Sequence, residues 1–404
     1  MIEKYYNGVI EQVAGGIGNV EHNSILVRYS NDFSIWDLES VNHYKDQTDI
    51  FFTCHEFSYN KIAEAYEPYL GLIRQMFHKY CSGTLEEFME ECDVYKLQRP
   101  VFESYFEKGF CERTEQILID EVEYEQERMR NSIVTMLQKL SEIRPVVIVL
   151  NRFQLASKST MQLSNSLLQV KNKNIGIVLG VNDVQSIPEF AHEEWDAICE
   201  SMDDRNMVYH IGNAGRNMEP DVMDYYSDYE SDDGYRKLNN LVYFLDFDQA
   251  DHHLSKIERR IKFDNFTISE KKHYQLLLLQ IMVSVLQRDI AKALESCEDL
   301  EKLQDQEKEG AFYYNFWMAT SYMYLGKLEE AMIYVQKAKE CGVELFVLDD
   351  GWFGARTTDH AGLGDWVANP DRLPDGITGI AEDIENVGLK FGLWFEPEMT
   401  NKDS

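Results

Sequence analysis

Short apolar runs alternate with helical patterns through residues 1–218, and this alternation constrains the fold more than any other feature. Strands of a parallel sheet are buried on both faces and read as continuous apolar runs, and helices must connect them. The pattern therefore predicts an α/β domain with a parallel sheet between helices. One long helical stretch spans residues 117–143. The runs with the length of a buried strand are Asp49–Cys54, Pro145–Leu150, Ile175–Gly180 and Met207–Ile211.

The charge balance narrows the classes of partner. The 404 residues include 39 Lys and Arg against 71 Asp and Glu, a formal net charge of -32. Such a surface repels phosphate backbones and anionic membranes, so we expect no nucleic-acid and no membrane partner. Seven scattered cysteines lack any Cys-x-x-Cys spacing, which argues against a disulfide framework and a zinc site. The sequence shows no basic leader and no apolar run long enough to span a membrane, so we expect a cytoplasmic protein. We also expect no bound metal and no cofactor.

A glycine-rich run at Ala14–Val20 is the nearest approach to a phosphate-binding loop. Such a loop needs a lysine for the phosphates and a Ser or Thr hydroxyl for Mg²⁺. Asn19 stands where the lysine belongs, and Val20 stands where the hydroxyl belongs. We therefore expect a flexible glycine turn after a strand at Val9–Val13, without phosphate binding.

The order of segments in residues 1–218 resembles the nucleotide-binding domain of AAA-like, STAND-type signalling ATPases. The resemblance rests on Cys54-His-Glu-Phe57, on the proline-led run that follows, and on the later run that ends in Asn182-Asp183. It implies a P-loop-like fold in which the first strand after the long helices ends in acidic residues that hold magnesium. In this sequence that strand ends in Leu150-Asn151-Arg152. We therefore expect a degenerate ATPase-like domain that does not hydrolyse ATP.

An acidic tract rich in tyrosine occupies residues 219–235 and predicts a solvated linker. A cation site is the alternative, because carboxylates bind hard cations, but the spacing differs from that of a calcium-binding loop. The aspartates concerned are Asp224, Asp228, Asp232 and Asp233.

Residues 236–341 have nearly continuous helical periodicity. Ala311–Gly342 resembles a tetratricopeptide repeat, with Ala319 and Ala331 where two helices approach and Gly326 in the turn between them. A weaker echo covers residues 274–303. The resemblance implies a helical region that binds a protein partner. We expect the adjacent pair His252-His253 to lie on the surface, because ligand pairs on a helix prefer wider spacing.

The composition changes at residue 343. Two apolar runs, Val343–Leu348 and Leu389–Trp394, flank a loop and a helix at Ile377–Asn386 that Gly388 closes. This order predicts one βαβ unit. Each run is followed directly by carboxylate and aromatic residues, and ligands usually bind at the carboxyl ends of parallel strands. We expect a binding site there.

Residues 342–404 resemble the microbial α-galactosidases of glycoside hydrolase family 36. The resemblance implies a βαβ fragment of a (β/α)8 barrel and an α-galactoside ligand. It assigns Asp349 and Asp350 to the sugar hydroxyls and Trp394 to the sugar ring; loop capping and core packing are the alternatives. The matching strings are Leu348-Asp-Asp-Gly-Trp-Phe-Gly354, Leu363-Gly-Asp-Trp366, Leu373-Pro-Asp-Gly376 and Gly388-Leu-Lys-Phe-Gly-Leu-Trp-Phe-Glu-Pro-Glu-Met399.

Catalysis needs more than these sugar-binding residues, because a retaining glycosidase uses a carboxylate nucleophile and a second carboxyl group as acid and base. The family resemblance places the nucleophile after a Lys-Trp-Asp string, and this sequence has none; Trp36-Asp37 and Trp195-Asp196 lack the lysine. We therefore expect no catalytic residues and an inactive chain. We also hypothesise a chimera with its seam at residues 330–345. The alternative function is a regulatory or scaffolding protein.

Overall fold

The computed structural model describes most of the chain, which forms two compact units. The first unit comprises Met1–Ile117 and Glu123–Ile257, and the second comprises Leu118–Val122 and Glu258–Ser404. No helix in the described ranges is both long and apolar enough to cross a membrane. The described residues are 2–19, 23–30, 34–45, 49–58, 61–111, 122–170, 172–182, 191–203, 208–211, 229, 231–264, 266–303, 308–325, 327–348, 352–354, 362, 364 and 366–395.

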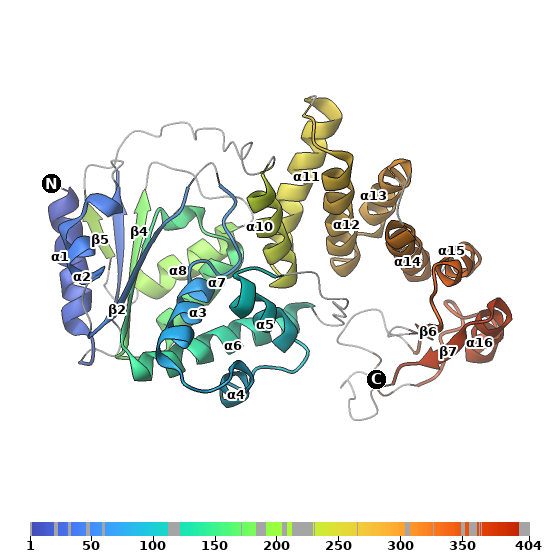
Figure 1. Cartoon of the computed structure of the whole chain (residues 1–404), viewed down its shortest axis with the longest axis horizontal. Coiled ribbons are helices and arrows are strands. Elements are labelled where there is room, and N and C mark those ends of the chain that lie inside the picture. The colour runs from blue at the N-terminus through green and yellow to red at the C-terminus, as the bar shows by residue number, and fades with distance from the viewer. Residues whose placement is uncertain are drawn as a thin grey trace. The chain divides into compact units, whose positions relative to one another are not determined.

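The first unit is built on a five-stranded parallel sheet (Figure 1). Its strand order is β2-β3-β4-β1-β5. Every residue of β3 and β4 is buried, as expected for central strands covered on both faces. The four apolar runs predicted as buried strands are confirmed as β2 to β5, whereas β1 was not predicted. The strands are β1 (Asn23–Tyr29), β2 (Phe51–Glu56), β3 (Val146–Asn151), β4 (Ile175–Asn182) and β5 (Val208–Ile211).

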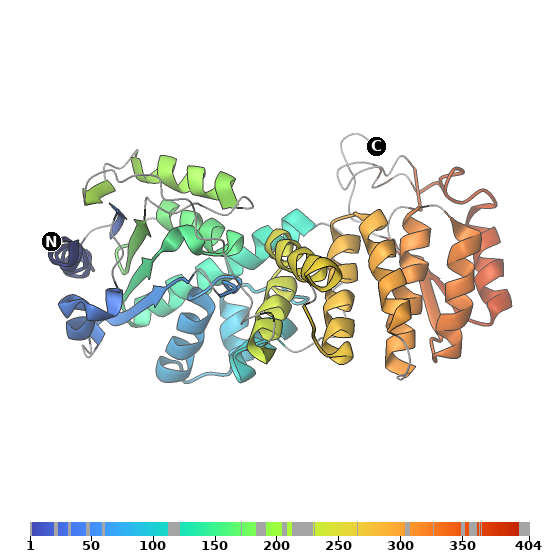
Figure 2. The same cartoon turned by 90° about the horizontal axis from the view of Figure 1, so that it is seen from above.

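Helices cover both faces of this sheet, with α1 and α2 on one side and α3, α6, α7 and α8 on the other (Figures 1 and 2). The long helix predicted at residues 117–143 is described from Val122 as α6, and it buries an apolar stripe that includes Met129, Ile133 and Leu140. The helices are α1 (Ile2–Gly16), α2 (Glu39–Lys45), α3 (Tyr69–Tyr80), α4 (Leu85–Glu91), α5 (Arg99–Lys108), α6 (Val122–Ile143), α7 (Lys158–Gln169) and α8 (His192–Asp203), with short 3-10 turns η1 (Ile35–Asp37) and η2 (Phe153–Leu155).

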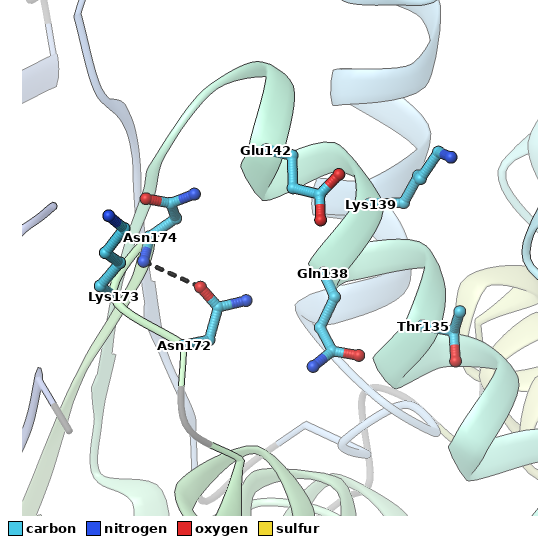
Figure 3. A pocket seen from close by; sticks show the side chains of 7 residues that line it. All are labelled: Thr135, Gln138, Lys139, Glu142, Asn172, Lys173 and Asn174. Atoms are coloured by element: carbon cyan, nitrogen blue, oxygen red, sulfur yellow. Dashed lines mark hydrogen bonds between the residues drawn. The ribbon is translucent and has the colours of Figure 1, made fainter. Parts of the chain in front are cut away.

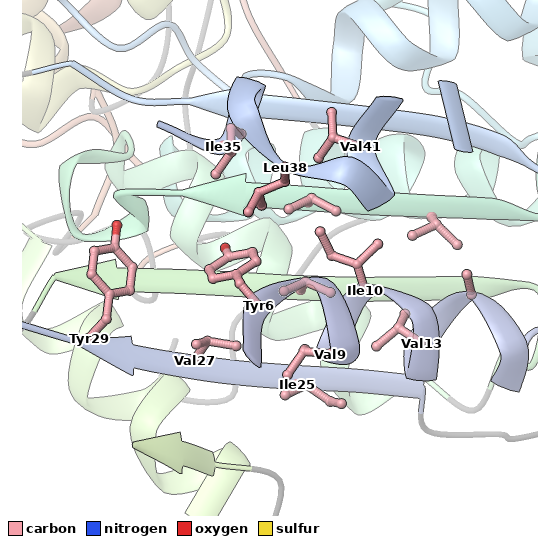
Figure 4. Close-up of a cluster of buried hydrophobic side chains, with 14 residues drawn as sticks. Tyr6, Val9, Ile10, Val13, Ile25, Val27, Tyr29, Ile35, Leu38 and Val41 are labelled. Atoms are coloured by element: carbon pink, nitrogen blue, oxygen red, sulfur yellow. The ribbon is translucent and has the colours of Figure 1, made fainter. Parts of the chain in front are cut away.

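The predicted strand at Val9–Val13 is wrong, because these residues lie within α1. Tyr6, Val9, Ile10 and Val13 recur at helical spacing and pack into one buried cluster against the sheet (Figure 4). The glycine-rich run therefore begins within the last turn of α1, which ends at Gly16, and precedes β1. A phosphate-binding loop joins a strand to the helix after it, so the run does not occupy that position.

The last helices of the first unit correct two predictions, and the second of them continues past Ile257 into the second unit. α10 (Asp232–Tyr243) begins inside the predicted linker, and Tyr229 is buried rather than solvated. In α11 (Phe247–Phe263), His253 is buried and its Nδ1 lies 3.0 Å from the Tyr229 hydroxyl, so the prediction of a surface residue is wrong for His253; His252 is exposed as expected. The aspartates at positions 224 and 228 lie outside the described residues.

The second unit begins with helices in the predicted pairs. α12 packs on α13, and α14 packs on α15. Ala319 and Ala331, the small residues predicted at the contact of the second pair, are both buried. Gly326 lies outside the described residues, and the tetratricopeptide assignment stays a prediction. The helices are α12 (Glu270–Leu286), α13 (Ile290–Lys302), α14 (Lys308–Tyr324) and α15 (Leu328–Glu340).

The predicted βαβ unit is confirmed at the C-terminal end. β6 (Leu345–Leu348) and β7 (Lys390–Leu393) pair in parallel, and α16 (Gly376–Val387) lies between them in sequence. Gly388 ends α16 in the left-handed conformation, with φ 87°, as expected for a glycine cap. The βαβ unit shares one hydrophobic core with Ala319 of α14 and Val335 of α15.

Candidate functional site

The carboxyl ends of β6 and β7 lie side by side in the second unit. Leu348 pairs with Leu393 in the strand register, and the Trp394 amide donates to the Leu348 carbonyl at 3.0 Å. Asp349 and Asp350 follow Leu348 directly in the sequence but lie outside the described residues. The structure thus places Trp394 beside Leu348, which immediately precedes Asp349 and Asp350 in the sequence. The positions of those two carboxylates stay predictions.

Trp394 belongs to an aromatic cluster at these strand ends. The rings of Trp366 and Trp394 meet edge to face at 6.4 Å between centroids, and Trp366 lies 5.4 Å from Phe395 and 6.1 Å from Trp352. Trp352 is buried, whereas Phe395 is 49% exposed. Trp394 itself is half-buried, so part of its surface stays accessible. An accessible aromatic face held by other rings can pack against the apolar face of a ligand.

Hydrogen bonds fix the loop that supplies Trp352. Its indole Nε1 donates to the Trp394 carbonyl at 3.1 Å, which ties the loop to the end of β7. Asn369 reinforces the loop: its backbone amide donates to the Trp352 carbonyl at 2.9 Å, and its side-chain Nδ2 donates to the Gly354 carbonyl at 2.9 Å. Trp352, Asn369 and Phe395 were not predicted as site residues. The density of aromatic residues between positions 352 and 395 was a signal for Trp352 and Phe395.

The carboxyl edge of the five-stranded sheet in the first unit carries a second polar arrangement. The Tyr29 hydroxyl donates to Asn151 Oδ1 at 2.7 Å, and Asn151 Nδ2 donates to Glu56 Oε1 at 3.1 Å. These three residues end β1, β3 and β2. Ligands of open parallel sheets bind outside such strand ends, where the connections leave in opposite directions. Here the connection from β1 runs to β2 at one edge, and that from β4 runs to β5 at the other.

Asn151 stands where the ATPase resemblance implies a metal-binding carboxylate. It is fully buried, and its side chain is engaged by Tyr29 and Glu56. An amide has weaker affinity for a divalent cation than a carboxylate, and this one is committed to the protein. Among the described residues, no three His, Cys, Asp or Glu side chains come together as a set of metal ligands.

A polar surface groove of about 530 Å³ lies between the end of α6 and the residues before β4 (Figure 3). Some of its polar groups are engaged within the protein: Lys139 Nζ lies 3.1 Å from Glu91 Oε2, and the Asn174 amide donates to Asn172 Oδ1 at 2.8 Å. The residues that line it include no buried, converging set of polar groups of the kind that marks a ligand site. Its lining residues are Thr135, Gln138, Lys139, Glu142, Asn172, Lys173 and Asn174.

Comparison with known proteins finds similarity in one part of the chain. Residues 298–404 match the family model described as Melibiase. The match begins upstream of residues 342–404, for which the resemblance was predicted, and it includes α14 and α15. The predicted chimera seam at residues 330–345 therefore falls inside the matched range and inside the shared hydrophobic core. Neither finding supports a junction there.

The alignments with curated relatives are about as short as the Melibiase match. Alpha-galactosidase AgaA of Geobacillus stearothermophilus is 44% identical over 100 residues, which cover 24% of this chain and 13% of that enzyme. Probable alpha-galactosidase C of Aspergillus flavus is 51% identical over 87 residues, or 19% of this chain and 12% of the relative. Alpha-galactosidase 1 of Pediococcus pentosaceus is 49% identical over 70 residues, or 17% and 10%. The chain thus spans only about an eighth of the length of these relatives.

Proposed function

We propose that the C-terminal part of the chain binds the terminal galactosyl unit of an α-galactoside, in a site of the α-galactosidase type. The observation that carries the proposal is the pairing of strand ends, in which the Trp394 amide bonds to the carbonyl of Leu348 immediately before Asp349 and Asp350. The Melibiase match and the α-galactosidase relatives over this part of the chain support it.

The proposed roles follow from the shape of the sugar. Galactose presents an axial hydroxyl at C4 and a primary hydroxyl at C6. Adjacent carboxylates at Asp349 and Asp350 can accept a hydrogen bond from each, and bonds to charged groups are stronger than neutral ones. Trp394 offers an apolar ring face to the less polar side of the sugar. The same carboxylates discriminate against glucose, whose C4 hydroxyl is equatorial.

Calorimetric titration of the full chain tests this proposal. Methyl α-galactoside should bind, and methyl α-glucoside should bind at least about tenfold more weakly, because a charged acceptor then loses its hydrogen-bond partner. Asp350→Asn should weaken galactoside binding. Asp371→Asn, which removes an exposed carboxylate from the same segment, should leave it unchanged. Equal affinity for the two sugars, or equal affinity of the two variants, would contradict the assigned roles.

We further propose that a polypeptide of this sequence binds the sugar without hydrolysing it, because the 404 residues contain no Lys-Trp-Asp string to supply the nucleophile. An aryl α-galactoside assay of purified protein checks this. The rate should equal that of Asp350→Ala. Turnover that the substitution abolishes would show that the nucleophile lies elsewhere in the sequence.

A second candidate concerns the rest of the chain. The parallel sheet and the helix pairs favour a regulatory or scaffolding role, in which a degenerate ATPase-like domain and a helical region bind a protein partner. The buried and engaged Asn151 supports the degenerate assignment. Titration with Mg-ATP should release no binding heat. Measurable affinity would favour an active signalling ATPase instead.

A further inference from the structure

The backbone of Trp394 is held from two sides at the end of β7. Its amide donates to the Leu348 carbonyl at 3.0 Å, and its carbonyl accepts the indole Nε1 of Trp352 at 3.1 Å. Leu348 immediately precedes the predicted carboxylate pair in the sequence, and Trp352 follows that pair after one glycine. Trp394 therefore bonds to the chain on both sides of Asp349 and Asp350.

A short antiparallel bridge fixes Trp352 itself. Trp352 is 2% exposed, and its ring lies 5.1 Å from the Phe353 ring between centroids. Phe353 pairs with Ala368 in the bridge, and the Gly354 amide donates to the Val367 carbonyl at 2.7 Å. The indole group is thus placed by the bridge as well as by the hydrogen bond that it makes.

Asn369 connects this bridge to the residues before α16. In addition to its bonds to the bridge, its Oδ1 accepts the Asp371 amide at 2.9 Å, and its carbonyl accepts the Leu373 amide at 2.8 Å. Leu373 belongs to the hydrophobic core that the βαβ unit shares with α14 and α15. A continuous series of contacts therefore leads from that core through Asn369 and Trp352 to the backbone of Trp394.

Discrimination between galactose and glucose depends on how firmly the acceptor groups are held. The two sugars differ only in the direction of the C4 hydroxyl, so a carboxylate that can move follows either hydroxyl, whereas a fixed carboxylate accepts from only one of them. A segment that is attached at both ends also loses less conformational entropy when a ligand binds. The attachment of Leu348 and Trp352 to Trp394 therefore favours both affinity and selectivity.

We propose that Trp352 is a positioning residue that sets the preference of the site for galactosides over glucosides, a role that rests on the proposed function. Its indole N–H holds the Trp394 carbonyl, and Asn369 holds the bridge that carries the indole. Trp352 does not contact the sugar in this role. It acts through Trp394 and through the carboxylate pair whose segment it anchors.

The substitution Trp352→Phe tests this role, because it keeps a buried ring and removes the indole donor. Calorimetric titration of the full chain should show an affinity for methyl α-galactoside about fivefold lower than that of the unmodified protein, because a hydrogen bond that fixes the site is lost. The affinity for methyl α-glucoside should change by less than about twofold, so the ratio of the two affinities should fall. A merely structural role would lower the number of binding sites per chain and leave this ratio unchanged.

Three further measurements sharpen the result. Asn369→Ala leaves the indole in place but releases the bridge, so it should lower the ratio in the same direction. Trp317→Phe, which removes a half-buried indole of α14 from a different hydrophobic cluster of the same unit, should leave both affinities unchanged. In an Asp350→Asn background, Trp352→Phe should have little further effect, because both changes act on the same carboxylate.

The outcomes separate this role from the proposed function. No binding of methyl α-galactoside by the unmodified chain would overturn the proposed function itself. Binding by the unmodified chain, with a ratio that Trp352→Phe and Asn369→Ala both leave unchanged, would keep the galactoside site and overturn the positioning role. If Trp352→Phe does not fold, the ratio measured for Asn369→Ala decides.

Discussion

At the scale of single residues, Gly180 is the tightest position in the five-stranded sheet. It lies in β4, between the strands that supply Tyr29 and Asn151. A Cβ at this position would come within 2.1 Å of the Tyr6 hydroxyl and 2.7 Å of Asn151 Oδ1. The absence of a side chain therefore lets Tyr29 reach Asn151 across β4. The hydrogen bond between Tyr29 and Asn151 at the carboxyl edge of the sheet therefore depends on the glycine at position 180.

Gly180→Ala should destabilise the first unit by about 1–3 kcal/mol, because the added methyl overpacks a buried site and displaces Tyr6 or Asn151. The shift of the denaturant midpoint measures this cost. The matched control is Gly8→Ala in α1, where a Cβ would meet nothing within 4 Å. That control should stabilise the helix by roughly 0.5–1 kcal/mol. Similar effects of the two substitutions would contradict the packing at Gly180.

Asp246 predicts a pH dependence of stability in the same unit. Burial raises its pKa to about 6 from an ordinary value of 3.8, although the Ser159 amide donates to its Oδ2 at 2.9 Å. The folded protein therefore binds a proton that the unfolded chain releases. Its contribution is full below the ordinary value and disappears as the pH rises through about 6.

Asp246→Asn should remove this contribution to the pH profile, roughly 2–3 kcal/mol between the two pKa values. Unfolding free energies measured by denaturant titration at several pH values provide the check. Asp196→Asn, an exposed aspartate of α8, should leave the profile unchanged. A profile that Asp246→Asn does not alter would show that another group titrates.

At the scale of elements, the end of α16 sets the start of β7. Gly388 has φ 87°, and a Cβ there would lie 2.5 Å from Lys339 Nζ. Lys339 also donates to the Val387 carbonyl, which joins α15 to the end of α16. Gly388→Ala should cost about 1–2 kcal/mol, because a left-handed residue with a side chain is strained. Thermal unfolding of the second unit measures it, with the exposed Glu382→Ala in α16 as the control; equal melting temperatures would argue against the cap.

The elements also show what the sequence could and could not predict. Long apolar runs predicted β2 to β5, and glycine chemistry predicted the end of α16. The helix α1 was mistaken for a strand because Val9, Ile10 and Val13 were considered as a short run, whereas adding Tyr6 reveals the helical period. The buried His253 contacts Tyr229, which is 24 positions earlier in the sequence and on the other side of α10. No local pattern encodes such a contact.

The candidate site shows the same division. The position of Trp394 at a strand end followed from the apolar run before it, and the structure confirms that placement. Trp352 and Phe395 were missed because their contacts depend on how the loop before α16 folds back. The indole bond from Trp352 to the Trp394 carbonyl joins residues 42 positions apart. Sequence spacing alone does not predict such a return.

At the scale of the whole molecule, the matched range and the shared core coincide. Residues 298–404 match the Melibiase model, and α14, α15 and the βαβ unit contribute to one hydrophobic core. We therefore regard the second helix pair and the βαβ unit as parts of one folded segment. The remaining residues account for the larger share of the chain, and their parallel sheet gives them a separate candidate role.

The most direct test of the central proposal is the affinity of the full chain for methyl α-galactoside before and after Trp394→Ala. Loss of the ring should weaken binding about tenfold, because it removes the apolar face on which the sugar packs. Trp36→Ala, which removes a 48% exposed tryptophan from the first unit, should leave the affinity unchanged. Binding that survives Trp394→Ala undiminished, or no binding by the unmodified chain, would contradict the account.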